Sequence, residues 1–155
     1  MESLILEVNT WDHSRMAAIV DWLNDHEHMK HSRQRHASHN STSQQAYVQN
    51  LIGNGGSYLV FWDKKSLVGT ASLITDTFHG ICEIGILVSP LKKKHGYGKK
   101  IFSLSLEFCL AHYSPYKIRC GCSSQNLAMQ RILLASGFEL EAILKGEELQ
   151  DNSRK

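Results

Sequence analysis

The pattern of hydrophobic and polar positions in the middle of the chain predicts β-strands. Three runs rich in β-branched and aromatic residues are separated by the short polar segments DKKS and TFHG. These runs are SYLVFWD (residues 57–63), SLVGTASLITD (66–76) and ICEIGILV (81–88). Because tight turns join neighbouring antiparallel strands, we expect a three-stranded antiparallel meander here. Alternation also predicts a first strand near residues 4–10.

Apolar residues at helical spacing predict four helices. The first is supported by Met16, Ile19, Val20 and Leu23, and the four segments span residues 13–29, 43–53, 99–113 and 126–138. We expect Ser41 or Thr42 to cap the second helix, Gly53 to end it, and Asn126 and Gly137 to bound the fourth. The polar stretch 30–43 is interpreted as an irregular connection.

Two further strands are predicted at residues 116–122 and 139–144. The complete order is strand, two helices, three strands, helix, strand, helix, strand. An antiparallel meander followed by βαβ crossovers predicts a mixed α/β sheet, the α+β variety of the α/β class. No linker or repeat interrupts the sequence, so we expect one domain covering residues 1–155.

Composition narrows the classes of function. The chain has 155 residues, 42% of them hydrophobic, and a formal net charge of only +2, which argues against a polycationic nucleic-acid binder. The N-terminal residues lack the apolar core of a signal peptide and nothing approaches a membrane span, so a cytoplasmic protein is expected. The four cysteines lack metal or redox spacing and are interpreted as reduced thiols. The CGC sequence at residues 120–122, placed on a strand, suits core packing.

The segment KKKHGYGKK (92–100) lies between a predicted strand and a predicted helix. The first N–H groups of a helix lack internal partners and lie at the positive end of the helix dipole, so an anion binds there readily. Gly96 and Gly98 let the main chain approach such a ligand. The spacing is not that of a P-loop, and Ile101 replaces the third glycine of the dinucleotide fingerprint. The segment predicts a phosphate-binding loop.

Three motifs together resemble the GNAT superfamily of N-acetyltransferases. Lys93-Lys94-His95-Gly96-Tyr97-Gly98 resembles the acyl-coenzyme A loop, with lysine in the first position, EIGILVSP resembles the central strand, and NLAMQRILLASGF resembles the late Asn-(x)10-Gly-Phe helix motif. The branch that it looks most like includes ribosomal-protein N-terminal and amino-sugar-nucleotide acetyltransferases. The resemblance implies a GNAT fold whose final strand is missing here, since only KGEELQDNSRK follows residue 144. The open edge allows for a homodimer.

The resemblance also implies a donor site for acetyl-CoA as cosubstrate, with no metal. Its residues are Ile86, Leu87, Val88, Lys93, Lys94, His95, Gly96, Tyr97, Gly98, Lys99, Asn126 and Arg131. The Leu87 N–H would bind the thioester carbonyl as an oxyanion-type donor. Glu83 is interpreted either as the general base, directly or through water, or as a solvent-exposed carboxylate. The tyrosine that many members use as general acid is replaced by Leu133. The acid is then left to Tyr97, Ser123, Ser124 or water.

The acceptor side of the site is expected within the histidine-rich residues 26–39. Their spacing matches no standard zinc pattern, which argues against a metal site. The resemblance places Arg33, Arg35 and His36 where they could face an anionic acceptor, and a polar surface loop is the alternative. A primary amine on an amino-sugar nucleotide is the first hypothesis for the acceptor, and a protein N-terminus is the second. A noncatalytic acyl-CoA sensor and a nucleic-acid contact through the lysines are the rival hypotheses, and neither nucleic acid nor membrane is the expected partner.

Overall fold

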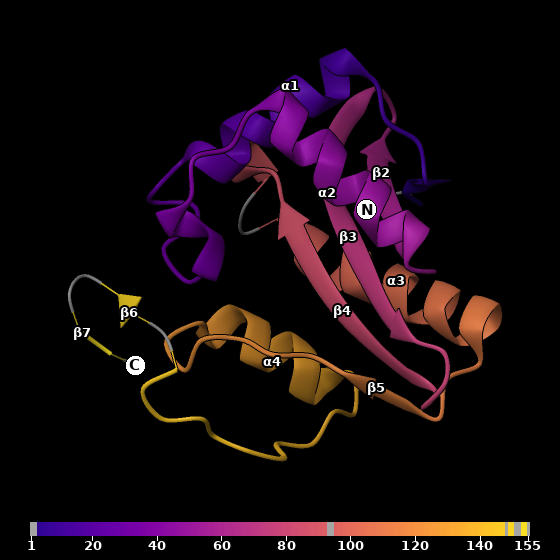
Figure 1. The fold of residues 1–155 in the computed structure, drawn as a ribbon, viewed down its shortest axis with the longest axis vertical. Coiled ribbons are helices and arrows are strands. Elements are labelled where there is room, and N and C mark those ends of the chain that lie inside the picture. The colour runs from indigo at the N-terminus through magenta and orange to yellow at the C-terminus, as the bar shows by residue number, and fades with distance from the viewer. Residues whose placement is uncertain (1–2, 93–94, 148, 151–152, 155) are drawn as a thin grey trace.

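A five-stranded mixed sheet forms the centre of the molecule (Figure 1). The computed structural model describes residues 3–92, 95–147, 149–150 and 153–154. The sheet has the order β1 (Ile5–Val8), β2 (Ser57–Asp63), β3 (Ser66–Asp76), β4 (Ile81–Val88) and β5 (Lys117–Arg119). Strands β1 to β4 pair with one another in antiparallel orientation, and β5 pairs with β4 in parallel orientation. The predicted meander and crossover are confirmed, and three strands have the predicted bounds.

Helices cover both faces of this sheet. Helix α3 (Tyr97–Tyr113) packs on one face, while α1 (His13–Asn24) and α2 (Ser41–Gly53) pack on the other. Helix α4 (Leu127–Ala135) follows β5 and contacts α3, and two 3-10 turns, η1 (Arg33–His36) and η2 (Pro90–Lys92), complete the order. Within the described residues, every helix is too short or too polar to span a bilayer.

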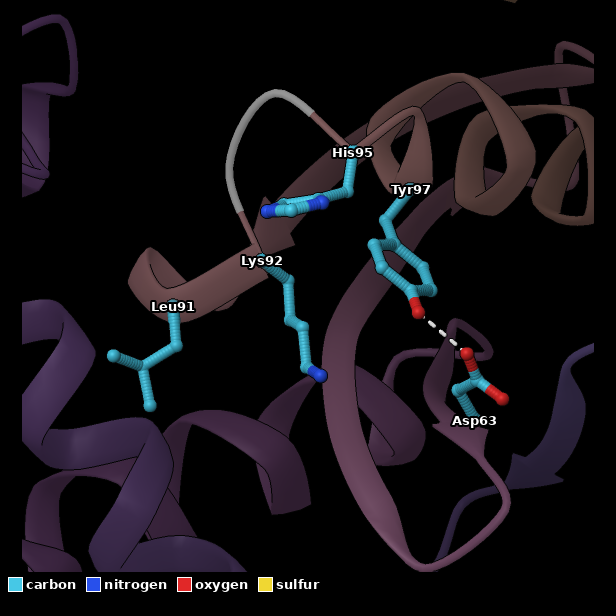
Figure 2. A pocket seen from close by; sticks show the side chains of 5 residues that line it. All are labelled: Asp63, Leu91, Lys92, His95 and Tyr97. Atoms are coloured by element: carbon cyan, nitrogen blue, oxygen red, sulfur yellow. Dashed lines mark hydrogen bonds between the residues drawn. The ribbon is translucent and has the colours of Figure 1, made fainter. Parts of the chain in front are cut away.

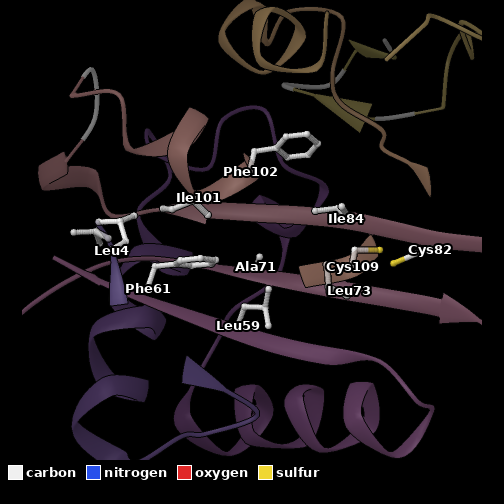
Figure 3. Packing of buried hydrophobic residues seen from close by; sticks show 11 residues of the cluster. Leu4, Leu59, Phe61, Ala71, Leu73, Cys82, Ile84, Ile101, Phe102 and Cys109 are labelled. Atoms are coloured by element: carbon white, nitrogen blue, oxygen red, sulfur yellow. The ribbon is translucent and has the colours of Figure 1, made fainter. Parts of the chain in front are cut away.

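The face beneath α3 holds the largest buried cluster (Figure 3). Alternate residues of a strand point to the same face, so Cys82 and Ile84 of β4 meet Phe102 of α3 here. Phe102 has no exposed surface, and its ring packs edge-to-face against Phe138 with ring centroids 5.5 Å apart. This contact joins the segment after α4 to the core.

The opposite face packs against α1 and α2. Met16, Val48 and Tyr58 lie in one cluster there, and Leu87 of β4 packs against a second cluster contributed by α1 and the turn that follows it. Odd-numbered residues of β4 therefore face α1 and α2, and even-numbered ones face α3. This alternation decides which side chains can reach a ligand from each side of the sheet.

The C-terminal part differs from the sequence-based prediction. The strand predicted at 116–122 is limited to Lys117–Arg119, and residues 139–144 form no strand. Leu140, Ile143 and Leu144 are 75%, 68% and 65% exposed. An alternating apolar sequence becomes a strand only where its backbone pairs with a partner strand, and the described part of the main sheet includes no pairing with these residues. Strands β6 (Leu149–Gln150) and β7 (Ser153–Arg154) pair only with each other, outside the main sheet.

The end of α1 and the cap of α2 also differ from the sequence-based prediction. Helix α1 ends at Asn24, five residues before the predicted end, because the Asp25 carboxylate accepts the His28 N–H at 3.0 Å and turns the chain. The cap of α2 is Asn40, not Ser41 or Thr42. Its side chain accepts the Ser43 N–H at 2.8 Å, while the Ser43 hydroxyl accepts the Asn40 N–H at 3.0 Å. These two bonds form a reciprocal capping box.

Candidate active site

Strands β4 and β5 separate after three paired residues. Their parallel pairing covers Ile81–Glu83 of β4 and Lys117–Arg119 of β5. At the next position the Cys120 thiol donates to the Ile84 carbonyl at 3.1 Å. Beyond this bond, the β5-facing edge of β4 has no strand partner among the described residues. An open strand edge inside a domain is a ready binding site for a ligand with amide groups.

The alternation of backbone groups identifies what this edge offers. Ser89 donates its N–H to Val68 at 2.8 Å, on the β3 side, whereas the Ile84 carbonyl faces β5. N–H and C=O groups change sides at every residue of a strand. Those of Ile86 and Val88 therefore face the unpaired edge of β4 beyond Cys120, which forms the opening between β4 and β5. Leu87 pairs with Thr70 of β3. This alternation directs the Leu87 N–H toward β3, whereas the sequence-based expectation assigned it to the thioester carbonyl.

The glycine-containing loop leads from β4 through η2 into α3. Gly96 is the N-cap of α3 with φ of 80°, a left-handed conformation that glycine adopts without strain. The first N–H groups of α3, from Tyr97 to Lys99, therefore point out of the helix end. His95 and Lys99 are exposed beside it. Lys93 and Lys94 lie outside the described residues.

Gly98 lies in close packing between α3, α4 and β4. A Cβ atom at this position would lie 3.3 Å from Ile132 Cδ1 of α4 and 3.6 Å from Val88 Cγ2 of β4. Such contacts leave little space for a side chain. Gly98 thus brings the start of α3 close to both β4 and α4, which places the helix end at the mouth of the opening.

The Tyr97 side chain points toward Asp63 (Figure 2). Its hydroxyl donates to the Asp63 carboxylate at the end of β2, and this hydrogen bond raises the pKa of Tyr97. Lys92 Nζ lies 5.9 Å from the centre of the tyrosine ring. These three side chains, with Leu91 and His95, line an open pocket of about 390 Å³. Since β2 and β5 lie on opposite sides of β4, the Tyr97 hydroxyl is directed away from the opening and is a poor candidate for the acid.

The loop between β5 and α4 closes the other side of the opening. Asn126 caps α4 as predicted, and its side chain accepts the Met129 N–H at 3.1 Å. Ser123 is buried and accepts the Gln125 N–H at 3.2 Å, while Ser124 is exposed. Leu133 packs against the cluster beneath α3. Arg131 is exposed on α4.

Glu83 lies at the base of the opening, on the face that α1 and α2 cover. Its carboxylate is 3.5 Å from Arg119 Nε, and the two side chains are 42% and 59% exposed. An ion pair this exposed contributes about 1 kcal/mol or less, so it fixes the carboxylate only loosely. Glu83 remains accessible to a ligand from that face.

The three expected acceptor residues share one short turn. Arg33, Arg35 and His36 all belong to η1. Arg35 donates to the Lys30 carbonyl at 3.1 Å, and an Arg33 guanidinium nitrogen lies 3.7 Å from the Glu147 carboxylate. The Glu147 contact brings η1 close to the segment that follows α4. Among the described residues, no group of three or more histidines, cysteines or carboxylates is arranged to hold a metal ion.

All four cysteines are outside disulfides. Cys82 and Cys109 are buried together beneath α3, and Cys122 is exposed in the loop after β5. Burial raises the pKa of Cys120 to about 12 and also raises the pKa values of Cys82 and Cys109. The CGC sequence is not on a strand, because β5 ends at Arg119.

These differences predict that one thiol reacts selectively. At pH 8, a thiol of pKa about 12 is ionised to roughly one part in ten thousand, and the thiolate is the reactive form. We therefore expect brief treatment with iodoacetamide to alkylate Cys122 alone in the folded protein and all four cysteines in urea. Peptide mass spectrometry reads the sites. Equal labelling of Cys120 and Cys122 in the folded protein would contradict this arrangement.

Comparison with known proteins identifies the class of this chain. Residues 4–139 match the acetyltransferase (GNAT) domain family, so the chain belongs to that family. It is an N-acetyltransferase that takes its acetyl group from acetyl-CoA, as the sequence motifs predicted. A search of curated protein sequences returned no match.

Solved structures share the fold at low sequence identity. Spermidine N-acetyltransferase from Vibrio cholerae, in complex with CoA and spermine, is 18% identical with a TM-score of 0.87 over 98% of this chain and 90% of that one. Ribosomal-protein-S5-alanine acetyltransferase from Vibrio fischeri is 16% identical, with a TM-score of 0.81 over 100% and 90%. RimL, a ribosomal L7/L12 α-N-protein acetyltransferase in complex with CoA, is 16% identical, with a TM-score of 0.76 over 96% and 88%.

Proposed function

We propose that this enzyme transfers the acetyl group directly from acetyl-CoA to a primary amine of an anionic acceptor, with an amino-sugar nucleotide as the first choice. The observation that carries this proposal is the open edge of β4. Ile86 and Val88 present backbone groups there, directly before the helix end that begins at Gly96. An extended amide chain followed by a pyrophosphate needs these two features in this order.

In this proposal the donor lies along β4. The backbone of Ile86 and Val88 binds the pantetheine amides and the thioester carbonyl, a role that moves from Leu87 to its neighbours. The N–H groups of residues 97–99 hold the pyrophosphate, and the Lys93, Lys94, His95 and Lys99 side chains add positive charge. Asn126 and the exposed Arg131 border the donor from the α4 side.

The reaction requires a neutral amine, because an alkylammonium with a pKa near ~10 is mostly charged at pH 7. Glu83 accepts that proton directly or through a water molecule. The amine nitrogen then forms a bond to the carbonyl carbon, and the thiolate of CoA leaves without a covalent enzyme intermediate. Leu133 offers no proton to the thiolate and Tyr97 is turned toward Asp63, which leaves water, Ser123 or Ser124 as the acid.

The acceptor is proposed to approach from the face that carries Glu83 and η1. Arg33, Arg35 and His36 bring cationic or hydrogen-bonding groups to that side, which suits a phosphate or nucleotide group. A protein N-terminus is the alternative acceptor, since two enzymes that share the fold act on ribosomal proteins. We expect a cytoplasmic enzyme of one domain, and a second copy could pair with the open edge at β5.

Calorimetry with acetyl-CoA, CoA and ATP tests the donor site, and release of free thiol tests the acceptor. We expect micromolar binding of acetyl-CoA and CoA, weak binding of ATP, and thiol release with amino-sugar nucleotides above that with simple amines. Binding without turnover on sugars or peptides would favour a sensor of acyl-CoA. If ATP binds as well as acetyl-CoA and salt weakens both steeply, the lysine-rich loop is a general polyanion contact.

Replacing Glu83 by glutamine should slow catalysis. Glutamine keeps the size of the side chain and cannot accept the proton, so we expect kcat at pH 7 to fall by about 100-fold or more. The deficit should shrink as the pH rises toward that at which the amine is already neutral. Steady-state kinetics from pH 6.5 to 9.5 measure both effects.

The control is Glu141→Gln. Glu141 also pairs with a cation of β5, with its carboxylate 2.7 Å from Lys117 Nζ, and it lies in the segment after α4. We expect this variant to keep wild-type kcat. An equal loss in both variants, or a pH-independent loss at Glu83, would mean that the carboxylate supports β5 and does not move a proton.

A further inference from the structure

A glycine follows the last paired residues of β4 and of β5. The parallel pairing ends at Glu83 and Arg119, so Gly85 and Gly121 each follow the last paired residue by two positions. A Cβ atom built on either glycine would meet no atom of the described residues within 4 Å. Neither glycine has a positive φ. The space and the backbone conformation would therefore both accept a side chain at these positions.

Other glycines of the sheet show why this is unusual. At Gly69, on β3, a Cβ atom would lie 2.5 Å from Ile101 Cδ1 and 2.6 Å from the Leu87 carbonyl oxygen, so the protein itself excludes a side chain. No such contact explains Gly85. Glycine inside a strand lowers stability because it is flexible and packs nothing, and it often marks a place where a ligand approaches the backbone. Gly85 fits the second description.

Polar side chains border the bare backbone at Gly85. The alternation along β4 puts Gly85 on the same face as Glu83, whose ion pair with Arg119 lies on one side of it. Ser72 lies beside Gly85 in the antiparallel register, and its hydroxyl accepts a hydrogen bond from Tyr47 of α2 at 3.0 Å. The uncovered main chain at Gly85 forms a floor next to the opening at Ile86, with the Glu83–Arg119 ion pair on one side and Ser72 on the other.

We infer that this floor selects the acceptor: it accommodates a substituent on the carbon that bears the amine. The inference rests on the proposed function and narrows its acceptor class. When the amine points at a thioester held by Ile86 and Val88, its own carbon lies over Gly85. An amine on a ring carbon or on the Cα of a residue fills this space, whereas an amine on a CH2 group leaves it empty.

The test compares acceptors that differ only in this substituent. One pair is a dipeptide amide beginning with alanine and the same compound beginning with glycine, and a second pair is 2-aminopropan-1-ol and 2-aminoethanol. We expect the wild-type enzyme to favour the substituted member of at least one pair about tenfold in kcat/KM, because the loss of one apolar group from a bound substrate costs about that much. Gly85→Val should remove the preference by slowing the substituted acceptor alone.

Three further readouts separate this role from a structural one. Because valine suits a strand and the site is open, Gly85→Val should keep or raise the Tm. Its Kd for acetyl-CoA should be unchanged. The matched control is Gly53→Ala at the end of α2, where a Cβ atom also meets nothing within 4 Å, and it should keep the wild-type preference.

The outcomes distinguish this inference from the proposed function. The inference would be overturned, with the donor site left intact, if kcat/KM were equal within both pairs or higher for the unsubstituted members. It would also be overturned if Gly85→Val lowered kcat/KM equally for all acceptors. Turnover of neither pair by a wild-type enzyme that binds acetyl-CoA would overturn it as well. Failure to bind acetyl-CoA would overturn the proposed function.

Discussion

Replacing Gly96 by valine should lower the affinity for acetyl-CoA by about tenfold or more, which corresponds to about 1.4 kcal/mol. Gly96 has φ of 80°, and a β-branched residue in that region carries strain of about 1–3 kcal/mol. The chain relieves this strain by moving the N-cap of α3, and the first N–H groups of the helix then no longer converge on one phosphate. Calorimetric titration with acetyl-CoA measures the change.

Gly55→Val is the control for strain alone. Gly55 has φ of 88° in the turn before β2, and a Cβ atom there would meet only Thr75 Oγ1, at the ordinary distance of 3.6 Å. We expect this variant to lose similar stability and to bind acetyl-CoA like the wild type. If both variants lose affinity equally, the effect at Gly96 arises from general loosening, and the loop is not the phosphate site.

Replacing Phe102 by alanine should cost about 3–5 kcal/mol of unfolding free energy. Phe102 is fully buried between α3 and the sheet and also contacts Phe138, so its removal leaves a cavity at the junction of α3 and the segment after α4. For a chain of this length, the loss corresponds to a drop in Tm of roughly 6–20 °C. Urea denaturation and calorimetry measure the two quantities.

Phe78→Ala is the control, because it also removes a phenylalanine side chain but from the surface of the protein. Phe78 is 90% exposed in the turn between β3 and β4, where it touches the His79 ring. We expect its effect on unfolding free energy to stay within about 0.5 kcal/mol. A loss at Phe102 no larger than at Phe78 would show that the cluster beneath α3 does not hold the fold together.

The sequence was most informative where local patterns and tertiary pairing agree. The segments 57–63, 66–76 and 81–88 have the predicted bounds because each is a continuous β-forming run closed by turn residues, and each finds an adjacent partner along the chain. Residues 139–144 have a similar apolar pattern without a neighbour in the main sheet, and they form no strand. A strand needs both features, and only one is visible in a single sequence.

Site residues divide in the same way. The unusual backbone conformation at Gly96 and the helix cap at Asn126 could be predicted, because each depends only on the residue itself and its own helix terminus. The partner of the Tyr97 hydroxyl could not, since Asp63 lies 34 positions away in the sequence. The backbone alternation puts the Leu87 N–H on the β3 side, one residue away from those that face the opening. Which side of a strand an N–H faces depends on register, which the Ser89 and Cys120 hydrogen bonds reveal only in the folded chain.

The two faces of the sheet have an evolutionary consequence. The parts assigned to the donor come from the unbroken stretch of residues 81–138, whereas η1, α1 and α2 belong to the first 53 residues. The cluster beneath α3 and the clusters beneath α1 and α2 are separated by the sheet itself. Substitutions that reshape one side leave the packing of the other largely unchanged, because distant sites contribute independently. Descendants of this chain can therefore exchange one amine for another while inheriting the same source of acetyl groups.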